Sequence, residues 1–166
     1  ARFAGDENQV AGADLAWRVH GSHRVSAMAL QSWSRVPGEQ SEAQKTSGAA
    51  VQANYGVSSR RFQVSGQFEH YDRDFQMDTA FQNQVGVTQG WVYAAPSFYP
   101  DATRYPWFKR FVPFFFFQYG RDRIQGGDPW VVVPGFRMNF TRQGFLRIDT
   151  IQGEEPFRQR TFRTSN

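Results

Sequence analysis

Polar and charged side chains recur at every second position along several stretches of this chain. Gln52 and Asn54, for example, alternate with Val51, Ala53 and Tyr55. Successive side chains of a β-strand point to opposite faces of the sheet, so the polar residues of neighbouring strands would gather on one face. Their amides, carboxylates and guanidinium groups could line a path for a small polar solute such as a sugar, or hydrogen-bond to one another as a structural network. The residues expected on this face, as the lining of a lumen, are Asp14, Arg18, Gln52, Asn54, Gln63, Gln67, Glu69, Arg137, Asn139, Arg147 and Asp149.

Residue types that suit catalysis are sparse. The chain has no cysteine, which excludes disulfides and thiolate metal sites. His20, His23 and His70 fall at a turn and at a strand end, where solvated side chains are expected, and the pattern places no base beside a nucleophile. His20 and His23 alone would make a poor metal site. We therefore expect no enzyme, no metal site and no cofactor.

Three acidic residues, Asp72, Asp74 and Asp78, lie close together in a polar stretch and could meet Ca²⁺ in an exposed loop. Calcium takes about 6–8 oxygen ligands, and the turn glycine and terminal glutamate of an EF-hand loop are missing here. A solvated loop held by turns between Asp side chains and the backbone is the favoured interpretation.

The composition is unusual for a soluble core. Aromatic residues make up 17% of the chain, whereas Leu and Ile are scarce. The mean hydropathy is −0.61, and no run approaches the ~18–20 apolar residues of a transmembrane helix. A membrane-spanning β-strand shows only half of its residues to lipid, so low hydropathy does not argue against such strands. The net charge of +4 comes from scattered arginines rather than one basic element, so nucleic-acid binding is not expected.

Residues 130–150 show the alternation most clearly. One parity is large and apolar, the other carries charge, and the turn 141–144 divides the segment into the two arms of a hairpin. We expect the apolar side chains to face lipid, the polar ones to face a lumen, and the turn to lie at the periplasmic rim. The expected lipid-facing residues are Phe136, Met138, Phe140, Leu146 and Ile148.

The same alternation predicts about eight strands along the chain. The predicted strands are 10–19, 24–34, 49–57, 62–69, 85–99, 107–119, 130–140 and 145–150; the short turns are 20–23, 58–60, 100–103 and 141–144; the long polar loops are 36–48, 72–83 and 121–128. Short turns thus alternate with long loops, as in up-and-down barrels of the outer membrane. The sequence therefore predicts an all-β fold, an antiparallel up-and-down transmembrane β-barrel, with residues 1–166 as one domain or as a segment of a larger barrel.

Tyrosine and tryptophan collect near the predicted strand ends, as two interfacial belts would require. These residues also favour strands in general, which is the alternative explanation. The belt near the short turns would contain Trp17, Tyr55, Tyr99, Tyr105 and Trp107, and the belt near the long loops Trp33, Tyr71, Tyr119 and Trp130.

Three prolines interrupt this pattern. Pro96, Pro113 and Pro134 fall inside predicted strands, although proline removes a donor from the hydrogen-bond ladder and is confined to edges or bulges. We expect β-bulges around them.

A resemblance to a known family rests on three motifs. They are the opening segment 8–14, the segment 66–71 followed by 75–81, and the strand pair running from Pro113 to Phe136. With these motifs the chain resembles a bacterial family of unknown function whose members carry a carbohydrate-binding-like domain, similar to family-nine modules, followed by a C-terminal outer-membrane β-barrel. The resemblance implies that the chain is a piece of the barrel, without the N-terminal module and with further strands after Asn166. It carries over no catalytic residues.

Two classes of function are consistent with these patterns. The first is an integral, porin-like protein of the Gram-negative outer membrane, acting in transport or anchoring a carbohydrate-binding module. The second is a soluble lipocalin-like carrier, which would bury its apolar face and show its polar face to water. An outer-membrane enzyme is not expected, because the parity assembles no Ser–His or Asp–His pair. Expected partners in the first class are outer-membrane lipid and lipopolysaccharide, a carbohydrate or other small polar solute, and other envelope proteins, with no nucleic acid.

Overall fold

The structure is a computed structural model that describes residues 2–3, 6–36, 44–77, 85–157 and 160–165. All strands of this part of the chain belong to one 11-stranded sheet, so the prediction of an all-β chain is confirmed. Among the described residues, no helix has the length and apolar character needed to cross a membrane. The strands are β1 Arg2–Phe3, β2 Asp6–Val19, β3 His23–Val36, β4 Gln44–Ser58, β5 Phe62–Tyr71, β6 Val87–Pro96, β7 Phe108–Asp122, β8 Trp130–Phe140, β9 Phe145–Asp149, β10 Gln152–Phe157 and β11 Arg160–Ser165.

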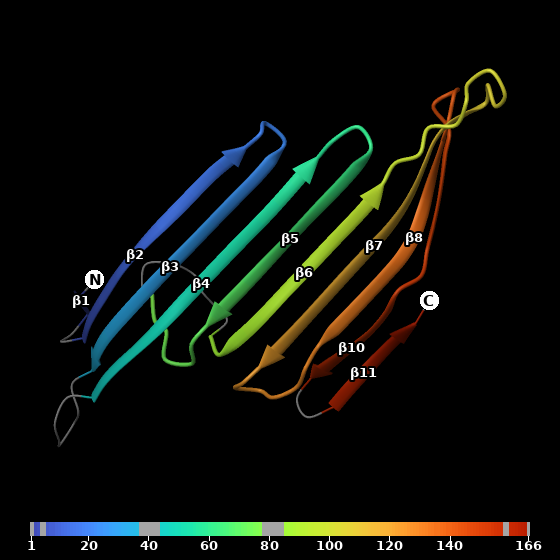
Figure 1. The fold of residues 1–166 in the computed structure, drawn as a ribbon. Helices are drawn as coiled ribbons and strands as arrows, with labels where there is room; N and C mark the ends of the chain where they lie inside the picture. Colours follow the sequence, from blue (N-terminus) through green and yellow to red (C-terminus); the bar gives the residue numbers. More distant parts are fainter. Residues whose placement is uncertain (1, 4–5, 37–43, 78–84, 158–159, 166) are drawn as a thin grey trace.

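The sheet is antiparallel and up-and-down. Each strand from β1 to β8 pairs with the next one along the chain, β9 and β10 both pair with β8, and β11 pairs with β10. Figure 1 shows the strands side by side with connections alternating between the two ends of the sheet. Within the described residues β1 and β11 end the order without pairing to each other, so the sheet is open. The closed barrel that the sequence predicts is not formed by these residues.

The strands match their predicted positions better than their predicted lengths. β8 has the predicted bounds, whereas β4 begins at Gln44, five positions before the predicted start at residue 49. β1, β10 and β11 were not predicted. The start of β4 contains short polar residues such as Ser47, which show no alternation with apolar residues. Because β4 pairs with β3 along the whole length of β3, the strand nevertheless extends through them. Ladder hydrogen bonds, which every residue except proline can both donate and accept, therefore extend the strands beyond their apolar pattern.

The prediction of a bulge at Pro134 is wrong. β9 and β10 pair with successive parts of β8 in the same register, and Pro134 lies between these parts. Thr150 donates its N–H to the Pro134 carbonyl oxygen at 3.1 Å, but proline has no N–H to return. The N–H that Pro134 lacks thus interrupts the ladder between β9 and β10, and no extra residue is inserted in either strand. A register shift occurs instead between Phe108 and Arg110, at the start of β7.

Pro96 and Pro113 meet the same problem on neighbouring strands. β6 and β7 keep one register on both sides of the position where these prolines face each other. Beyond it, Phe98 and Phe111 exchange backbone hydrogen bonds of 2.8 and 2.9 Å. The bulges expected here are also wrong, because two residues without a donor oppose each other and the ladder simply skips one rung.

The connection between β6 and β7 also corrects a prediction. The sequence predicts a short turn at 100–103, but residues 97–107 join the two strands. β6 ends at Pro96, and Pro100 and Pro106 prevent a regular strand from continuing. The alternation of short turns and long loops therefore holds for the turns 20–22, 59–61 and 141–144 and fails after β6.

The sheet is a single layer with little interior. The buried apolar residues of the described part are Ala50, Val57, Phe75, Ala95 and Val112, and Ser32 has the largest fully buried side chain. A soluble domain buries its large apolar side chains between two packed layers. Here those side chains stay exposed.

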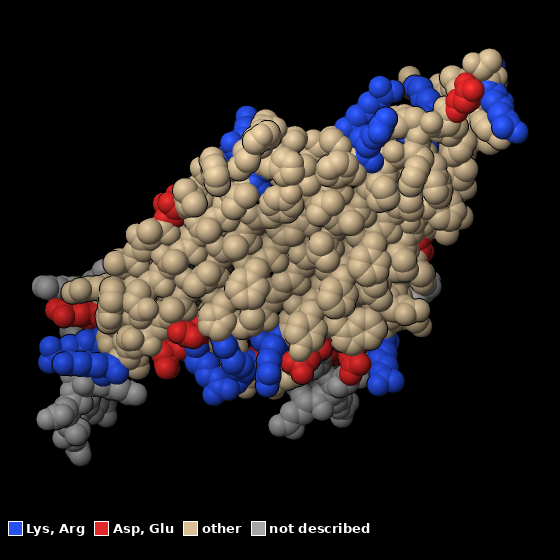
Figure 2. Space-filling view, in the orientation of Figure 1, with Lys and Arg blue, Asp and Glu red and all other residues tan. Residues whose placement is uncertain are grey.

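The exposed apolar side chains gather on one side of the sheet, which we call the apolar face. Among the exposed large apolar residues in the described strands, only Val10 and Phe145 point to the opposite side of the sheet. Figure 2 shows a face with an uncharged centre and with Lys, Arg, Asp and Glu side chains along its rims. The exposed members of the apolar face are Leu15, Trp17, Trp33, Val51, Tyr55, Phe62, Phe68, Val92, Phe115, Phe117, Tyr119, Leu146 and Ile148.

Candidate functional site

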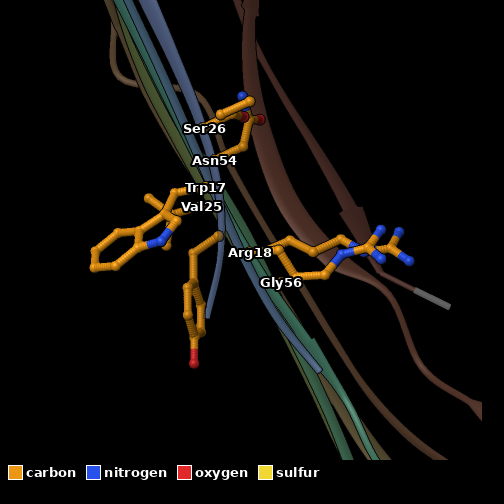
Figure 3. A pocket seen from close by; sticks show the side chains of 9 residues that line it. Trp17, Arg18, Val25, Ser26, Asn54 and Gly56 are labelled. Atoms are coloured by element: carbon orange, nitrogen blue, oxygen red, sulfur yellow. The ribbon is translucent and has the colours of Figure 1, made fainter. Parts of the chain in front are cut away.

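The polar residues singled out in the sequence lie together on the opposite side of the sheet, which we call the polar face. The register places all of them there, from Asp14 in β2 to Asp149 in β9. Figure 3 looks along the sheet, with Trp17 on one side and Arg18 and Asn54 on the other. The side chains drawn there come from both faces, so they do not enclose one cavity. The reddish C-terminal strands stand on the polar side in this view, so the sheet curves toward the polar face.

Glu69 is the centre of a hydrogen-bond network on the polar face. Its Oε1 accepts from Gln52 Nε2 at 3.2 Å and from Gln67 Nε2, and its Oε2 accepts from Gln89 Nε2 at 2.9 Å. Gln67 in turn accepts a hydrogen bond from the Trp91 indole at 3.0 Å. A carboxylate offers only acceptors, and three amide groups supply the matching donors. The network joins β4, β5 and β6, which favours a structural role for these residues.

An aromatic cluster adjoins this network on the polar face. The ring centroids of Trp91 and Phe116 are 6.1 Å apart, and those of Tyr93 and Phe114 are 6.3 Å apart. These side chains are half-buried. The sequence shows alternating Phe residues in β7, but which partners they meet depends on the register with β6 and could not be predicted. Partly exposed rings among polar groups are a surface that suits the apolar face of a sugar ring.

The two arginines of the β8–β9 hairpin face each other, as the sequence suggests. Arg137 lies directly opposite Arg147. Arg147 donates from Nε to Asp149 Oδ1 at 2.7 Å, and its guanidinium lies 4.9 Å from the centroid of the Phe114 ring. A hollow of about 70 Å³ lies between these arginines and Tyr93, which is room for about two water molecules. Asp149 thus offsets part of the charge, and the hollow is too small to enclose a sugar.

The segment 72–77, which follows β5, folds back across the polar face (Figure 1). The side chain of Phe75 is buried there, with 3% exposed. Gln76 donates its N–H to Ser32 Oγ at 3.1 Å. A Cβ at Gly48 would lie 2.6 Å from Phe75 Cα, so only glycine allows the segment to approach β4 so closely. The segment therefore narrows the space over the polar face at the long-loop rim.

Asp72 fixes the start of this segment. Its Oδ2 accepts the Ala49 N–H at 2.9 Å, and its Oδ1 lies 3.1 Å from His70 Nε2. The hydrogen bond from the Ala49 N–H has the largest effect and holds the pKa of the Asp72 carboxyl below its usual value. Burial opposes this lowering, whereas the hydrogen bond and charge of His70 and the charge of Arg123 add to it. Asp72 is therefore held by residues of β4 and β5 rather than by a turn within its own loop, whereas Asp74 is exposed. The third acidic residue, Asp78, lies outside the described residues.

The histidines are more engaged than the sequence indicates. His70 Nδ1 lies 2.7 Å from Thr88 Oγ1, and His23 Nδ1 lies 2.8 Å from Tyr55 Oη. The expectation of solvated rings is therefore wrong for these two. Both histidines lie at apolar-face positions near the end of a strand. There a polar side chain of the neighbouring strand is within hydrogen-bond distance.

The aromatic residues of the two expected belts fall into three groups. Tyr71 is on the polar face rather than the apolar one, because its parity matches Ala50, and its ring centroid lies 6.1 Å from that of Phe75. The expectation that it joins a belt facing outward is wrong. The residues in the connection 97–107 are Tyr99, Tyr105 and Trp107, and those on the apolar face are Trp17, Trp33, Tyr55, Tyr119 and Trp130.

Comparisons of the chain with models of known families, with curated proteins and with solved structures find no match. The geometry of the two faces is therefore the basis for a functional proposal.

Proposed function

We propose that this chain forms a membrane-spanning part of a bacterial outer-membrane β-barrel, with its apolar face against lipid and its polar face toward a lumen. One observation carries the proposal: a single-layer sheet exposes large apolar side chains across its centre and charged side chains along both rims. An apolar surface of this extent on a soluble monomer would be a site of aggregation. Lipid would cover it instead.

The dimensions of the apolar face support this proposal. On β3 the charge-free stretch runs from Val25 to Trp33, and on β7 it runs from Phe111 to Tyr119. At about 3.3 Å per residue and a tilt of about 45°, nine residues span about 21 Å. The apolar band of outer-membrane barrels is about 25 Å tall. Beyond this stretch, adjacent positions of the apolar face carry Arg35 and Lys45 at the long-loop rim.

The polar face supports a lumen rather than an aqueous outer surface. The segment 72–77 lies over it, and the sheet curves toward it. A lipocalin-like carrier has the reverse arrangement, with the apolar face inside. The soluble carrier is therefore the less favoured alternative.

Within such a barrel, the polar face would line a passage for a small polar solute. Exposed Arg137, the aromatic cluster around Trp91 and Tyr93, and the amides around Glu69 offer the contacts that a hydroxyl-rich or anionic solute uses. The segment 72–77 would narrow this passage at one rim. The other role consistent with the fold is a membrane anchor with a filled interior.

Two measurements test this proposal. The protein is reconstituted into phospholipid vesicles, which are then washed at alkaline pH and floated on a density gradient. We expect the protein to float with the lipid, and a monodisperse, detergent-free monomer that stays with the aqueous fraction would contradict the membrane proposal. Single-channel recording in a planar bilayer then separates the two roles, since steady conductance supports a passage and none supports an anchor.

A further inference from the structure

The two rims of the sheet differ in charge. The short-turn rim comprises the connections 20–22, 59–61, 97–107 and 141–144 with the two strand residues on either side of each. Its basic residues are Arg18, Arg24, Arg60, Arg61, Arg104, Lys109 and Arg142, and its one acidic residue is Asp101. The opposite rim mixes both signs among the described residues, with Arg35, Lys45, Asp72, Arg73, Asp74, Arg121, Asp122, Arg123 and Asp128. A strongly basic rim attracts an anionic surface.

A hollow of about 500 Å³ lies at the short-turn rim, where the apolar face ends. Its position at the end of the apolar face follows from Pro96, which pairs with Phe62, and from Phe98, which pairs with Phe111. A volume of about 300–1,000 Å³ is the usual range for a small-molecule site. The residues that line it are Arg60, Arg61, Pro96, Ser97, Phe98 and Tyr99.

The turn that presents the two arginines is fixed in place. Ser59 Oγ accepts the N–H of Arg61 at 3.3 Å and that of Phe62 at 3.1 Å. The carbonyl of Arg61 accepts the Ser97 N–H at 2.6 Å, and that of Arg60 accepts the Tyr99 hydroxyl at 2.8 Å. The backbone of the turn is thus tied to the connection that forms the other wall of the hollow.

The guanidinium groups of these arginines remain available to a ligand. Arg60 lies 4.9 Å from the centroid of the Tyr99 ring, a cation–π contact that orients the group without using its N–H donors. Within the described part of the chain, neither Arg60 nor Arg61 forms an ion pair with a carboxylate. Guanidinium groups match phosphate oxygens in charge and geometry.

We infer that this hollow binds the headgroup of an anionic glycerophospholipid. The phosphate contacts Arg60 and Arg61, and the side chain of Ser97, which also lines the hollow, can hydrogen-bond to a headgroup hydroxyl. The acyl chains follow the apolar face past Phe62. This inference rests on the proposed membrane function, since it needs the apolar face to be against lipid. It also sets the orientation: the short-turn rim lies in the phospholipid leaflet, as short turns of outer-membrane barrels do.

Lipid retention measured by native mass spectrometry tests the inference. The protein is released from vesicles that contain phosphatidylglycerol and phosphatidylcholine, and the ratio of the two lipids retained is measured. Replacing both Arg60 and Arg61 by glutamine removes the charge-assisted contacts to the phosphate and should lower the preference for phosphatidylglycerol at least about 30-fold. The matched control is the double variant Arg104→Gln, Arg142→Gln, which removes the same charge from the same rim outside the hollow and should keep most of the preference.

Each other outcome of this experiment contradicts the inference. Equal losses in both double variants would mean diffuse attraction to the basic rim and no built site. Inorganic phosphate or lipopolysaccharide added to the same vesicles gives two further arms of the experiment. Displacement of phosphatidylglycerol by inorganic phosphate at equal concentration would mean a site for a free anion, and stronger retention of lipopolysaccharide would place the rim in the other leaflet. The variant Arg60→Lys keeps the charge and serves if the double variant does not insert; it should lower the preference only partly. Failure of the unmodified protein to insert into any vesicle would contradict the proposed function itself.

Discussion

Arginine substitutions at two adjacent residues of β4 separate the lipid-facing and lumen-facing assignments. Ala53 lies on the apolar face between Ala27 and Phe68, and Asn54 lies on the polar face between Ser26 and Gln67. Neither substitution removes a large side chain, and both introduce the same group. The comparison therefore isolates the environment of each face.

The depth of Ala53 sets the expected magnitude. Its partner Ala27 is two residues from Ala29, the middle of the charge-free stretch of β3, which corresponds to about 5 Å from the middle of the band at about 3.3 Å per residue and a tilt of about 45°. This is near the middle of a band about 25 Å tall, where an arginine on the lipid face costs about 2–4 kcal/mol. Asn54→Arg should change the free energy of unfolding by no more than about 0.5 kcal/mol, as a solvated surface substitution does.

The assay is urea unfolding of vesicle-inserted protein, followed by tryptophan fluorescence. We expect Ala53→Arg to lower the folded-to-unfolded ratio at least about 10-fold more than Asn54→Arg does. Equal effects of the two variants, or a larger loss for Asn54→Arg, would refute the assignment of the faces. In a soluble carrier with a buried apolar lining, Ala53→Arg would instead prevent folding in detergent-free buffer.

Three further predictions concern the polar face. Gly48→Ala should displace the segment 72–77 at a cost of about 1–3 kcal/mol and speed its cleavage by protease, whereas Gly56→Ala, where a Cβ meets nothing within 4 Å, should leave cleavage unchanged. Because the pKa of Asp72 is lowered in the folded state, its carboxylate stabilises the fold fully at pH values above the usual pKa of 3.8, and this stabilisation is lost as the pH falls through the lowered pKa. Cleavage of the segment should therefore accelerate in acid, and Asp72→Asn should remove that pH dependence. Glu69→Leu leaves three amide groups without their acceptor and should cost about 1–3 kcal/mol in urea unfolding, clearly more than Glu69→Gln, and equal losses would argue against the network.

The faces of the sheet were predictable from the sequence because side-chain direction in a strand depends only on parity. The alternation around Gln52 and around Arg137 placed both residues on the polar face correctly. Apart from Arg137 and Arg147, which a short turn places opposite each other, contacts between strands were not predictable, because they depend on register, which shifts every partner at once. The ring contact between Trp91 and Phe116 and the approach of Phe75 to Gly48 belong to this class.

The prolines show a second limit of sequence reasoning. A proline inside a strand pattern indicates a lost donor, and a bulge is the usual explanation. Whether the opposing residue needs that donor depends on what lies across the ladder. Pro96 and Pro113 oppose each other, so neither requires a bulge, and no pattern within one strand could reveal this.

Alternating solvent and lipid access along β4 is the most direct test of the central claim. The chain has no cysteine, so single cysteines can be introduced at each position from 51 to 56 and labelled with a nitroxide. In vesicles, collision rates with oxygen, which dissolves in lipid, should be high at 51, 53 and 55, and those with a water-soluble nickel chelate should be high at 52, 54 and 56. Equal access of the nickel chelate to both sets of positions would contradict a membrane-spanning sheet.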